Sequence, residues 1–116
     1  MEEGRLMQTM LLDFYGELLT DKQRACYELH YNEDLSLAEI AEQSGISRQG
    51  VWDNIRRADA ALREIEDKTG LIGRFSDQRA TLERLREMMD ELGRLTDGKA
   101  KEIADEALRA IDALRD

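Results

Sequence analysis

Apolar residues return every three or four positions along most of this chain, which is the period of amphipathic α-helices. The first stripe predicts a helix over residues 5–18, and its apolar members are Leu6, Met7, Met10, Leu11, Phe14 and Leu18. Thr20 and Gln23 then have the spacing of a capping box, in which each side chain hydrogen-bonds the backbone of the other residue. A second helix is therefore expected over residues 21–31, with Ala25, Cys26 and Leu29 facing inward.

Residues 36–57 hold the strongest pattern in the chain. Ser36 and Glu39 form a second capping-box pair, and the short helix that follows has an apolar face of Leu37, Ile40 and Ala41. Gly45 is placed to end this helix in the left-handed conformation that glycine adopts easily. Ser47 caps the next helix, whose apolar residues are Val51, Ile55, Ala58, Leu62 and Ile65.

This pattern matches a helix-turn-helix motif. The motif needs a small residue where its helices cross, a glycine at the turn and a branched apolar residue on its second helix. Ala41, Gly45 and Val51 meet these needs at the right spacing. We therefore predict a helix-turn-helix core over residues 20–68.

The second helix of the motif continues well beyond the motif itself. Its apolar residues persist from Arg48 to about Lys68. Gly70 has the usual position after a helix C-terminus, where Leu71 is able to fold back.

Two more helices are expected towards the C-terminus. Periodicity places them over residues 77–92 and 99–114, with breaks at Gly93 and at residues 97–98. They predict a helical hairpin over residues 71–116, packed on the first helix or paired with another copy of the chain. The predicted fold is thus all-α and without a wing, a single domain over residues 1–116 with a C-terminal helical arm.

Composition agrees with a small helical protein and excludes several other classes. The chain has no proline, 5% aromatic residues and 37% charged residues. Its apolar runs are too short to span a membrane, and its N-terminus lacks the basic-then-apolar order of a signal peptide. One cysteine suits a reducing compartment. We expect a cytoplasmic protein that does not insert into membranes.

The formal net charge of −9 changes the expectation for nucleic acid. A dedicated DNA-binding protein usually has a basic face, because neutralising phosphates releases counterions and supplies most of the affinity. Here the acidic excess is spread evenly, and even the helix-turn-helix region is not net basic. Any binding of nucleic acid is therefore expected to be weak and salt-sensitive, or to depend on a partner protein.

No residue pattern indicates catalysis or a bound metal. The single histidine, His30, lacks a neighbouring nucleophile and an orienting acid, and with the single Cys26 it cannot complete a zinc site. Gly70 and Gly73 are not followed by the Lys-Ser/Thr of a phosphate loop. We expect a non-enzyme without a cofactor or metal, with Cys26 as a small core residue. The three tyrosines are expected to be half-buried: Tyr15, Tyr27 and Tyr31.

Several segments resemble the YlxM family of helix-turn-helix proteins. They are the DFY of residues 13–15, the LLT of residues 18–20, the LSL of residues 35–37, the EIAE of residues 39–42 and the SRQ of residues 47–49. The likeness covers residues 10–75 in the family's order and fades beyond about residue 80. The same segment is more loosely similar to region four of alternative sigma factors. The resemblance implies a small cytoplasmic bacterial protein, encoded beside the signal recognition particle GTPase and its receptor and regulating that pathway.

The outward face of the second motif helix holds the candidate site. On a helical wheel Gln49, Asp53 and Arg56 lie opposite the apolar stripe of this helix, Arg57 lies close by, and Arg48 and Trp52 flank that face. The candidate nucleic-acid-binding residues are Arg48, Gln49, Trp52, Asp53, Arg56 and Arg57. In a DNA-reading arrangement, arginine contacts phosphate or guanine and glutamine pairs with adenine in the major groove. Asp53 can accept from a cytosine amino group but is repelled by phosphates. The alternative is a solvated face of mixed charge.

Two residues of this helix depart from the usual family pattern, in which tyrosine and alanine are common at these positions. Trp52 either packs, partly buried, against the first or second helix, or it stacks on an unpaired RNA base or anchors a protein interface. Gly50 loosens the first turn by up to about 1 kcal/mol relative to alanine.

Two functions stay open at this level. The first is a regulatory helix-turn-helix protein of the signal recognition particle pathway, which binds DNA, the particle's RNA, or a pathway protein such as the GTPase or its receptor. The second is a protein-interaction module that keeps the helix-turn-helix shape without reading bases. Such a module forms a homodimer through its C-terminal helices or docks a partner on them.

Overall fold

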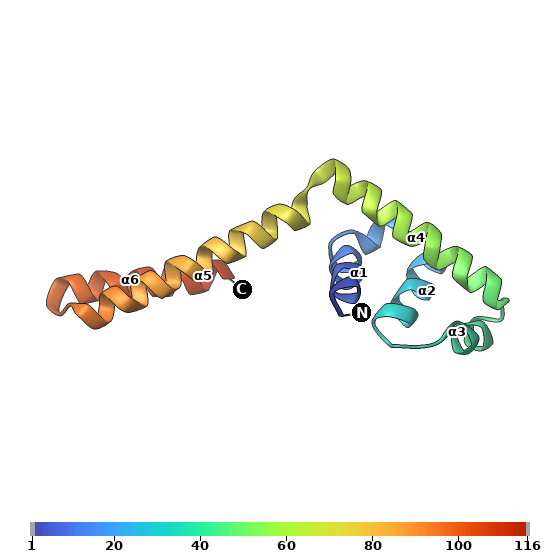
Figure 1. Ribbon diagram of the computed structural model, residues 1–116, viewed down its shortest axis with the longest axis horizontal. Helices are drawn as coiled ribbons and strands as arrows, with labels where there is room; N and C mark the ends of the chain where they lie inside the picture. Colours follow the sequence, from blue (N-terminus) through green and yellow to red (C-terminus); the bar gives the residue numbers. More distant parts are fainter. Residues whose placement is uncertain (1, 116) are drawn as a thin grey trace. The chain divides into compact units, whose positions relative to one another are not determined.

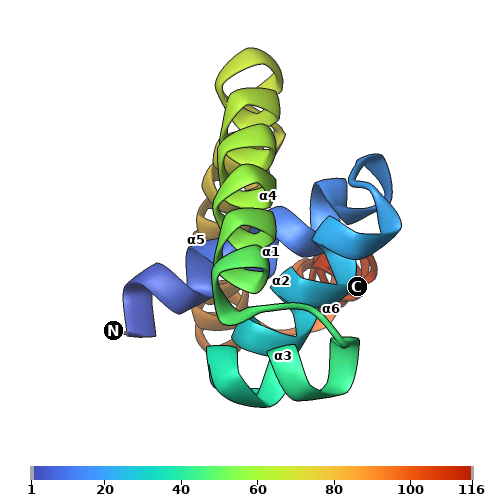
Figure 2. The same cartoon turned by 90° about the vertical axis from the view of Figure 1, so that its right-hand side faces the viewer.

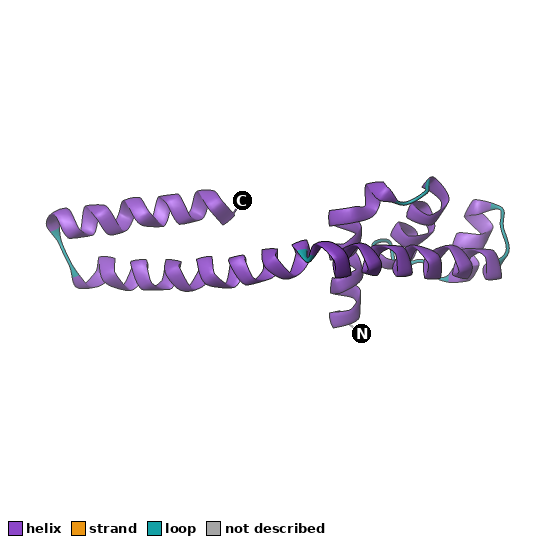
Figure 3. Cartoon of the chain, turned by 90° about the horizontal axis from the view of Figure 1, so that it is seen from above, coloured by secondary structure: helices purple, strands orange, loops and turns teal. Residues whose placement is uncertain are grey.

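Helices make up all of the regular structure in the computed structural model, which describes residues 2–115 (Figure 1, Figure 3). In chain order they are α1 (Glu2–Tyr15), the short 3-10 helix η1 (Gly16–Leu18), α2 (Asp21–Tyr31), α3 (Leu37–Ser44), α4 (Arg48–Thr69), α5 (Leu71–Leu95) and α6 (Gly98–Arg115). The all-α prediction is confirmed. None of the described helices is long and apolar enough to cross a membrane.

The chain divides into two compact units, one reaching to Ile72 and the other starting at Gly73. The first unit contains α1 to α4, and the second contains most of α5 and all of α6. The predicted domain boundaries stay predictions: a single domain over residues 1–116, a helix-turn-helix core over 20–68 and a C-terminal hairpin over 71–116.

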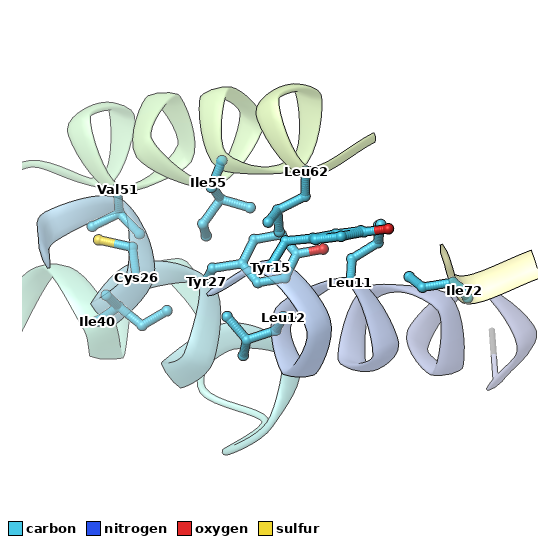
Figure 4. Packing of buried hydrophobic residues seen from close by; sticks show 11 residues of the cluster. Leu11, Leu12, Tyr15, Cys26, Tyr27, Ile40, Val51, Ile55, Leu62 and Ile72 are labelled. Atoms are coloured by element: carbon cyan, nitrogen blue, oxygen red, sulfur yellow. The ribbon is translucent and has the colours of Figure 1, made fainter. Parts of the chain in front are cut away.

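Helix α4 is the centre of the first unit, since α1, α2 and α3 all pack against it. Figure 2 shows α3 near the N-terminal end of α4. The apolar stripe predicted from periodicity faces inward: Val51, Ile55, Ala58 and Leu62 are at most 1% exposed. Figure 4 shows how they meet side chains from the other three helices, among them Leu11, Cys26 and Ile40. The face opposite the stripe is thereby left to solvent.

The predicted caps fix the ends of the helices in the motif. Thr20 and Gln23 form the expected capping box at the start of α2, and Ser36 and Glu39 form one at the start of α3. Gly45 ends α3 with a φ of 71°, a left-handed conformation that a Cβ would strain. The helix expected over residues 5–18 is different: α1 stops at Tyr15, and a 3-10 turn follows.

Two of the three tyrosines are more deeply buried than the expected half-core position. Tyr27 is 0% and Tyr15 4% exposed, whereas Tyr31 is half-buried. The Tyr27 hydroxyl donates to Asp59 Oδ1 at 3.0 Å, and Arg63 Nε donates to the other oxygen of Asp59 at 2.8 Å. The deep burial is possible because each phenol finds a polar partner. In α2, Cys26 is buried as expected, but Ala25 is exposed.

Helix α5 starts at Leu71, six residues earlier than periodicity predicted, and side chains at the end of α4 cap it. Glu66 Oε1 accepts hydrogen bonds from the Ile72 amide at 3.0 Å and from the Tyr15 hydroxyl at 2.6 Å. The Leu71 amide lies 3.4 Å from Thr69 Oγ1. Ile72 is 3% exposed and Leu71 45%. Ile72 is therefore the residue after Gly70 that joins the core cluster, whereas Leu71 remains largely at the surface.

The second unit has two helices side by side (Figure 3). Gly93 continues α5 instead of breaking it, and it is buried against α6, where an added Cβ would lie 3.9 Å from Ala104 Cβ. Arg86 Nε donates to Asp112 Oδ1 at 2.8 Å across the pair. The large apolar side chains of this unit that are exposed are Phe75, Leu85, Met88, Leu92, Leu95, Ile103 and Leu114.

Candidate nucleic-acid interface on helix α4

The N-terminal half of α4 is rigidly placed on the first unit. Val51 and Ile55 anchor it in the core. The Ser47 hydroxyl caps it by accepting from the Gly50 amide at 3.0 Å, and the Asn54 amide donates to the Gly50 carbonyl at 3.0 Å. No role was predicted for Asn54. Its side chain supports the first turn beneath the candidate residues, and its spacing of four from Gly50 was the only available signal.

The six candidate residues share the surface of this half of the helix. Arg48, Gln49, Trp52, Arg56 and Arg57 are exposed, and Asp53 is half-buried among them. No acidic residue occupies the first turn of α4. The partial positive charge of the helix N-terminus is therefore not offset locally by an acidic side chain.

Asp53 joins three of the candidate residues into one network. Gln49 Nε2 donates to Asp53 Oδ1 at 3.2 Å, and Arg56 Nη2 lies 3.6 Å from the same oxygen. The Asp53 side chain is 38% exposed and that of Arg56 64%. This brings the glutamine and one arginine together over a single carboxylate.

Arg48 and Arg57 lie outside this network. Both are exposed, and neither forms an ion pair or a side-chain hydrogen bond within the described residues 2–115. Their guanidinium groups are therefore available to an anion. Two unpaired arginines on either side of a glutamine–aspartate–arginine network combine donors for phosphate with polar groups for a base edge.

Trp52 is 43% exposed, so a large part of the indole lies at the surface of the same half-helix. An exposed indole can stack on a base or fill a pocket of a partner. This exposure is compatible with both functional hypotheses for Trp52, stacking on a base and anchoring a protein interface.

His30 and Cys26, the side chains with the most scope for catalysis or metal binding, have structural surroundings. His30 is half-buried, with Nδ1 2.9 Å from the Leu35 carbonyl oxygen. Burial raises the pKa of the Cys26 thiol, which disfavours the reactive thiolate. Within the described residues, no three His, Cys, Asp or Glu side chains gather in a way that could hold a metal ion.

Comparison with known proteins gives one consistent family. The family model for UPF0122, described as "Putative helix-turn-helix protein, YlxM / p13 like", matches residues 2–107. A UPF0122 protein of Thermoanaerobacter sp. is 40% identical over 115 residues, 98% of each chain. One of Halalkalibacterium halodurans is 44% identical over 91 residues, 78% of this chain and 84% of its own. One of Geobacillus kaustophilus is 47% identical over 87 residues, 75% and 79% of the two chains. The family match extends well past residue 80, where the resemblance was expected to fade.

Proposed function

The chain belongs to the UPF0122 family of YlxM/p13-like helix-turn-helix proteins, and from this premise we propose that it is a cytoplasmic regulatory protein that binds nucleic acid through the exposed face of α4. The observation that carries the proposal is the placement of Arg48 and Arg57, exposed and unpaired within the described residues, beside the Gln49–Asp53–Arg56 network. That face lies opposite the buried stripe of the second helix of the motif, where a groove-reading helix carries its contacts.

The regulated process that we propose is co-translational protein targeting by the signal recognition particle. This part of the proposal rests on the resemblance to the YlxM family. The target is then DNA or the particle's own RNA, and the particle's GTPase or its receptor is the protein partner. The net charge of −9 favours an assisted or weak interaction.

The test is a salt titration of binding to duplex DNA and to the particle's RNA. An Arg48→Ala/Arg57→Ala variant is expected to bind about tenfold or more weakly, and each lost phosphate contact should lower the salt slope by about 0.9. The matched control is Arg84→Ala/Arg109→Ala, which removes the same charge from exposed positions in the second unit. Equal losses in both variants, or no binding by the wild type at low salt, would contradict the proposal.

A second function is favoured by the exposed apolar side chains of the second unit. Leu92 and Leu95 are 42% and 75% exposed, and Met88 is 52% exposed on the same helix. Surface side chains of this kind, three and four residues apart, suit pairing with another amphipathic helix. This candidate is a protein-interaction module that forms a homodimer through α5 and α6.

Sedimentation analysis separates the two functions. A Leu92→Glu/Leu95→Glu variant should be monomeric at concentrations where the wild type is a dimer, and α4 should still bind nucleic acid. Ser76→Glu/Thr81→Glu adds the same charge at exposed polar positions of α5 and serves as the control. A wild type that stays monomeric at high concentration removes the homodimer.

A further inference from the structure

We propose that Asp53 determines the sequence specificity of the α4 face. One carboxylate oxygen orients Gln49 and Arg56, and the other accepts a hydrogen bond from the exocyclic amino group of cytosine or adenine in the major groove of duplex DNA. This inference rests on the proposed nucleic-acid function and names what the site selects.

The division of labour between the two oxygens is visible in the contacts. The Gln49 amide, at 3.2 Å, and the Arg56 guanidinium, at 3.6 Å, both approach Oδ1. Oδ2 accepts no hydrogen bond within the described part of the chain. Because an ionised carboxylate only accepts, Oδ2 is an unused acceptor on an exposed helix face.

The three side chains form a line along the helix. Gln49, Asp53 and Arg56 follow at steps of four and three residues, so they share one face. Asp53 is half-buried, with 38% of its side chain exposed. Its carboxylate is therefore less free to move than that of a fully exposed side chain. A fixed acceptor between two donors is the arrangement that reads a base edge by its pattern of polar groups.

Base chemistry decides what Oδ2 accepts from. In the major groove only the amino groups of cytosine and adenine donate, whereas guanine and thymine present acceptors at the corresponding edge positions. A carboxylate facing guanine or thymine is left unpaired and repelled. Asp53 therefore discriminates chiefly by rejecting the wrong base.

The same charge explains why an acidic residue belongs on a DNA-binding face. A carboxylate near phosphates weakens binding to every sequence, and a compensating base contact restores the affinity only at the right one. The ion pair to Arg56 is mostly exposed, so it holds that arginine loosely and leaves it free to contact guanine or phosphate.

The test is an Asp53→Ala variant, which removes both carboxylate oxygens and the charge; an asparagine would not serve, because its amide pairs with adenine. Selection from a random duplex pool should give wild-type sites with cytosine or adenine at one position. We expect the variant to lose this preference by about tenfold and to bind random duplex DNA several-fold more tightly. Glu64→Gln is the matched control, because it removes one negative charge from an exposed position of α4 paired with Lys68.

Each outcome bears on the proposal. An unchanged base preference in Asp53→Ala overturns it, and so does a gain in affinity equal to that of Glu64→Gln without loss of preference. Selection of single-stranded RNA in place of duplex DNA also overturns it. The wild type could bind nucleic acid through Arg48 and Arg57 without selecting any base. That result would overturn the role of Asp53 but would still support the proposed function. If no protein binds any nucleic acid at low salt, both fail. Circular dichroism of each variant verifies that it is folded.

Discussion

Tyr27 shows how a single buried phenol makes stability depend on pH. Its ring is fully buried and its hydroxyl donates to Asp59. Burial, followed by the charge of Asp59, raises the pKa of Tyr27 far above its ordinary value. The neutral phenol is therefore favoured in the folded state. Its contribution to stability is complete below about pH 10, the pKa of an unfolded tyrosine, and is lost as the pH rises further.

We expect a Tyr27→Phe variant to be less sensitive to alkali than the wild type. At neutral pH it should lose about 1 kcal/mol, the value of one hydrogen bond, because Asp59 keeps its partner Arg63. Between about pH 9 and pH 11 its unfolding free energy should fall less than that of the wild type. Urea unfolding at the two pH values measures both effects. Parallel curves for the two proteins would contradict the assignment. The pKa values of Tyr15 and Tyr31 are also raised by burial, so some dependence should persist.

Two glycines at the turn of the motif should respond oppositely to alanine. Gly50 is helical, and an added Cβ would lie 3.3 Å from Ser47 Oγ. This hydroxyl is exposed, and the other two serine or threonine caps accept a residue with a Cβ at the same position. Gly50→Ala should therefore stabilise the protein by up to about 1 kcal/mol. Gly45→Ala should destabilise it by about 1–2 kcal/mol, because the φ of 71° strains any Cβ. Thermal unfolding distinguishes the two signs.

At the level of elements, the end of α4 and the start of α5 are joined by a remote cap. The carboxylate of Glu66 accepts from the Ile72 amide and the Tyr15 hydroxyl, across the left-handed Gly70. A Glu66→Ala variant should lose about 1–2 kcal/mol, as for other cap deletions, and the amides of residues 71–74 should exchange faster. Glu64→Ala on the same helix should change stability by less than about 0.5 kcal/mol. Equal exchange rates in the two variants would remove the capping role.

The same contrast explains which elements could be predicted. The starts of α2 and α3 depend on a cap and a glutamine or glutamate three residues later, and the start of α4 depends on the Ser47 cap, so the sequence itself contains these signals. The start of α5 depends on Glu66, which lies on the preceding helix beyond a glycine, and local spacing does not contain that contact. Gly93 was expected to break a helix, but it lies within α5, where it packs against α6 near Ala104.

The candidate site was predictable for a related reason. A buried stripe at helical period defines the opposite face, so Gln49, Asp53 and Arg56 could be placed together on α4 from the sequence. Periodicity does not give the side-chain partners. The shared contact of Gln49 and Arg56 with one oxygen of Asp53, and the freedom of Arg48 and Arg57 from ion pairs among the described residues, needed coordinates.

On the scale of the whole molecule, both units contain carboxylates that stabilise only when ionised. A hydrogen bond from the Ser36 backbone amide lowers the pKa of Glu39 in the first unit, and a hydrogen bond from Arg86 lowers that of Asp112 in the second. Their contributions are present above the pKa of the unfolded groups, about 4, and are lost as the pH falls. Acid also reduces the repulsion within a chain of net charge −9.

Variants separate these opposing effects. Glu39→Gln and Asp112→Asn should be less stable than the wild type at pH 7, and the difference should shrink towards about pH 3, where the wild-type groups are protonated. Amide hydrogen exchange assigns each loss to its unit, since Glu39 reports on α3 and Asp112 on α6. A difference that stays constant with pH would mean that neither charge contributes to stability.

The buried thiol of Cys26 is a built-in probe for local opening of the first unit. The chain has one cysteine, and its side chain is 3% exposed in the core cluster that includes Val51 and Ile40 (Figure 4). A thiol reagent should react slowly with so shielded a side chain and faster when α2 and its neighbours separate, so the labelling rate reports on opening of the helix-turn-helix without any introduced probe. A molecule that binds the α4 face and stabilises the closed form should lower the rate of thiol labelling. Ligands of unknown identity can thus be screened by chemistry at a site they never touch.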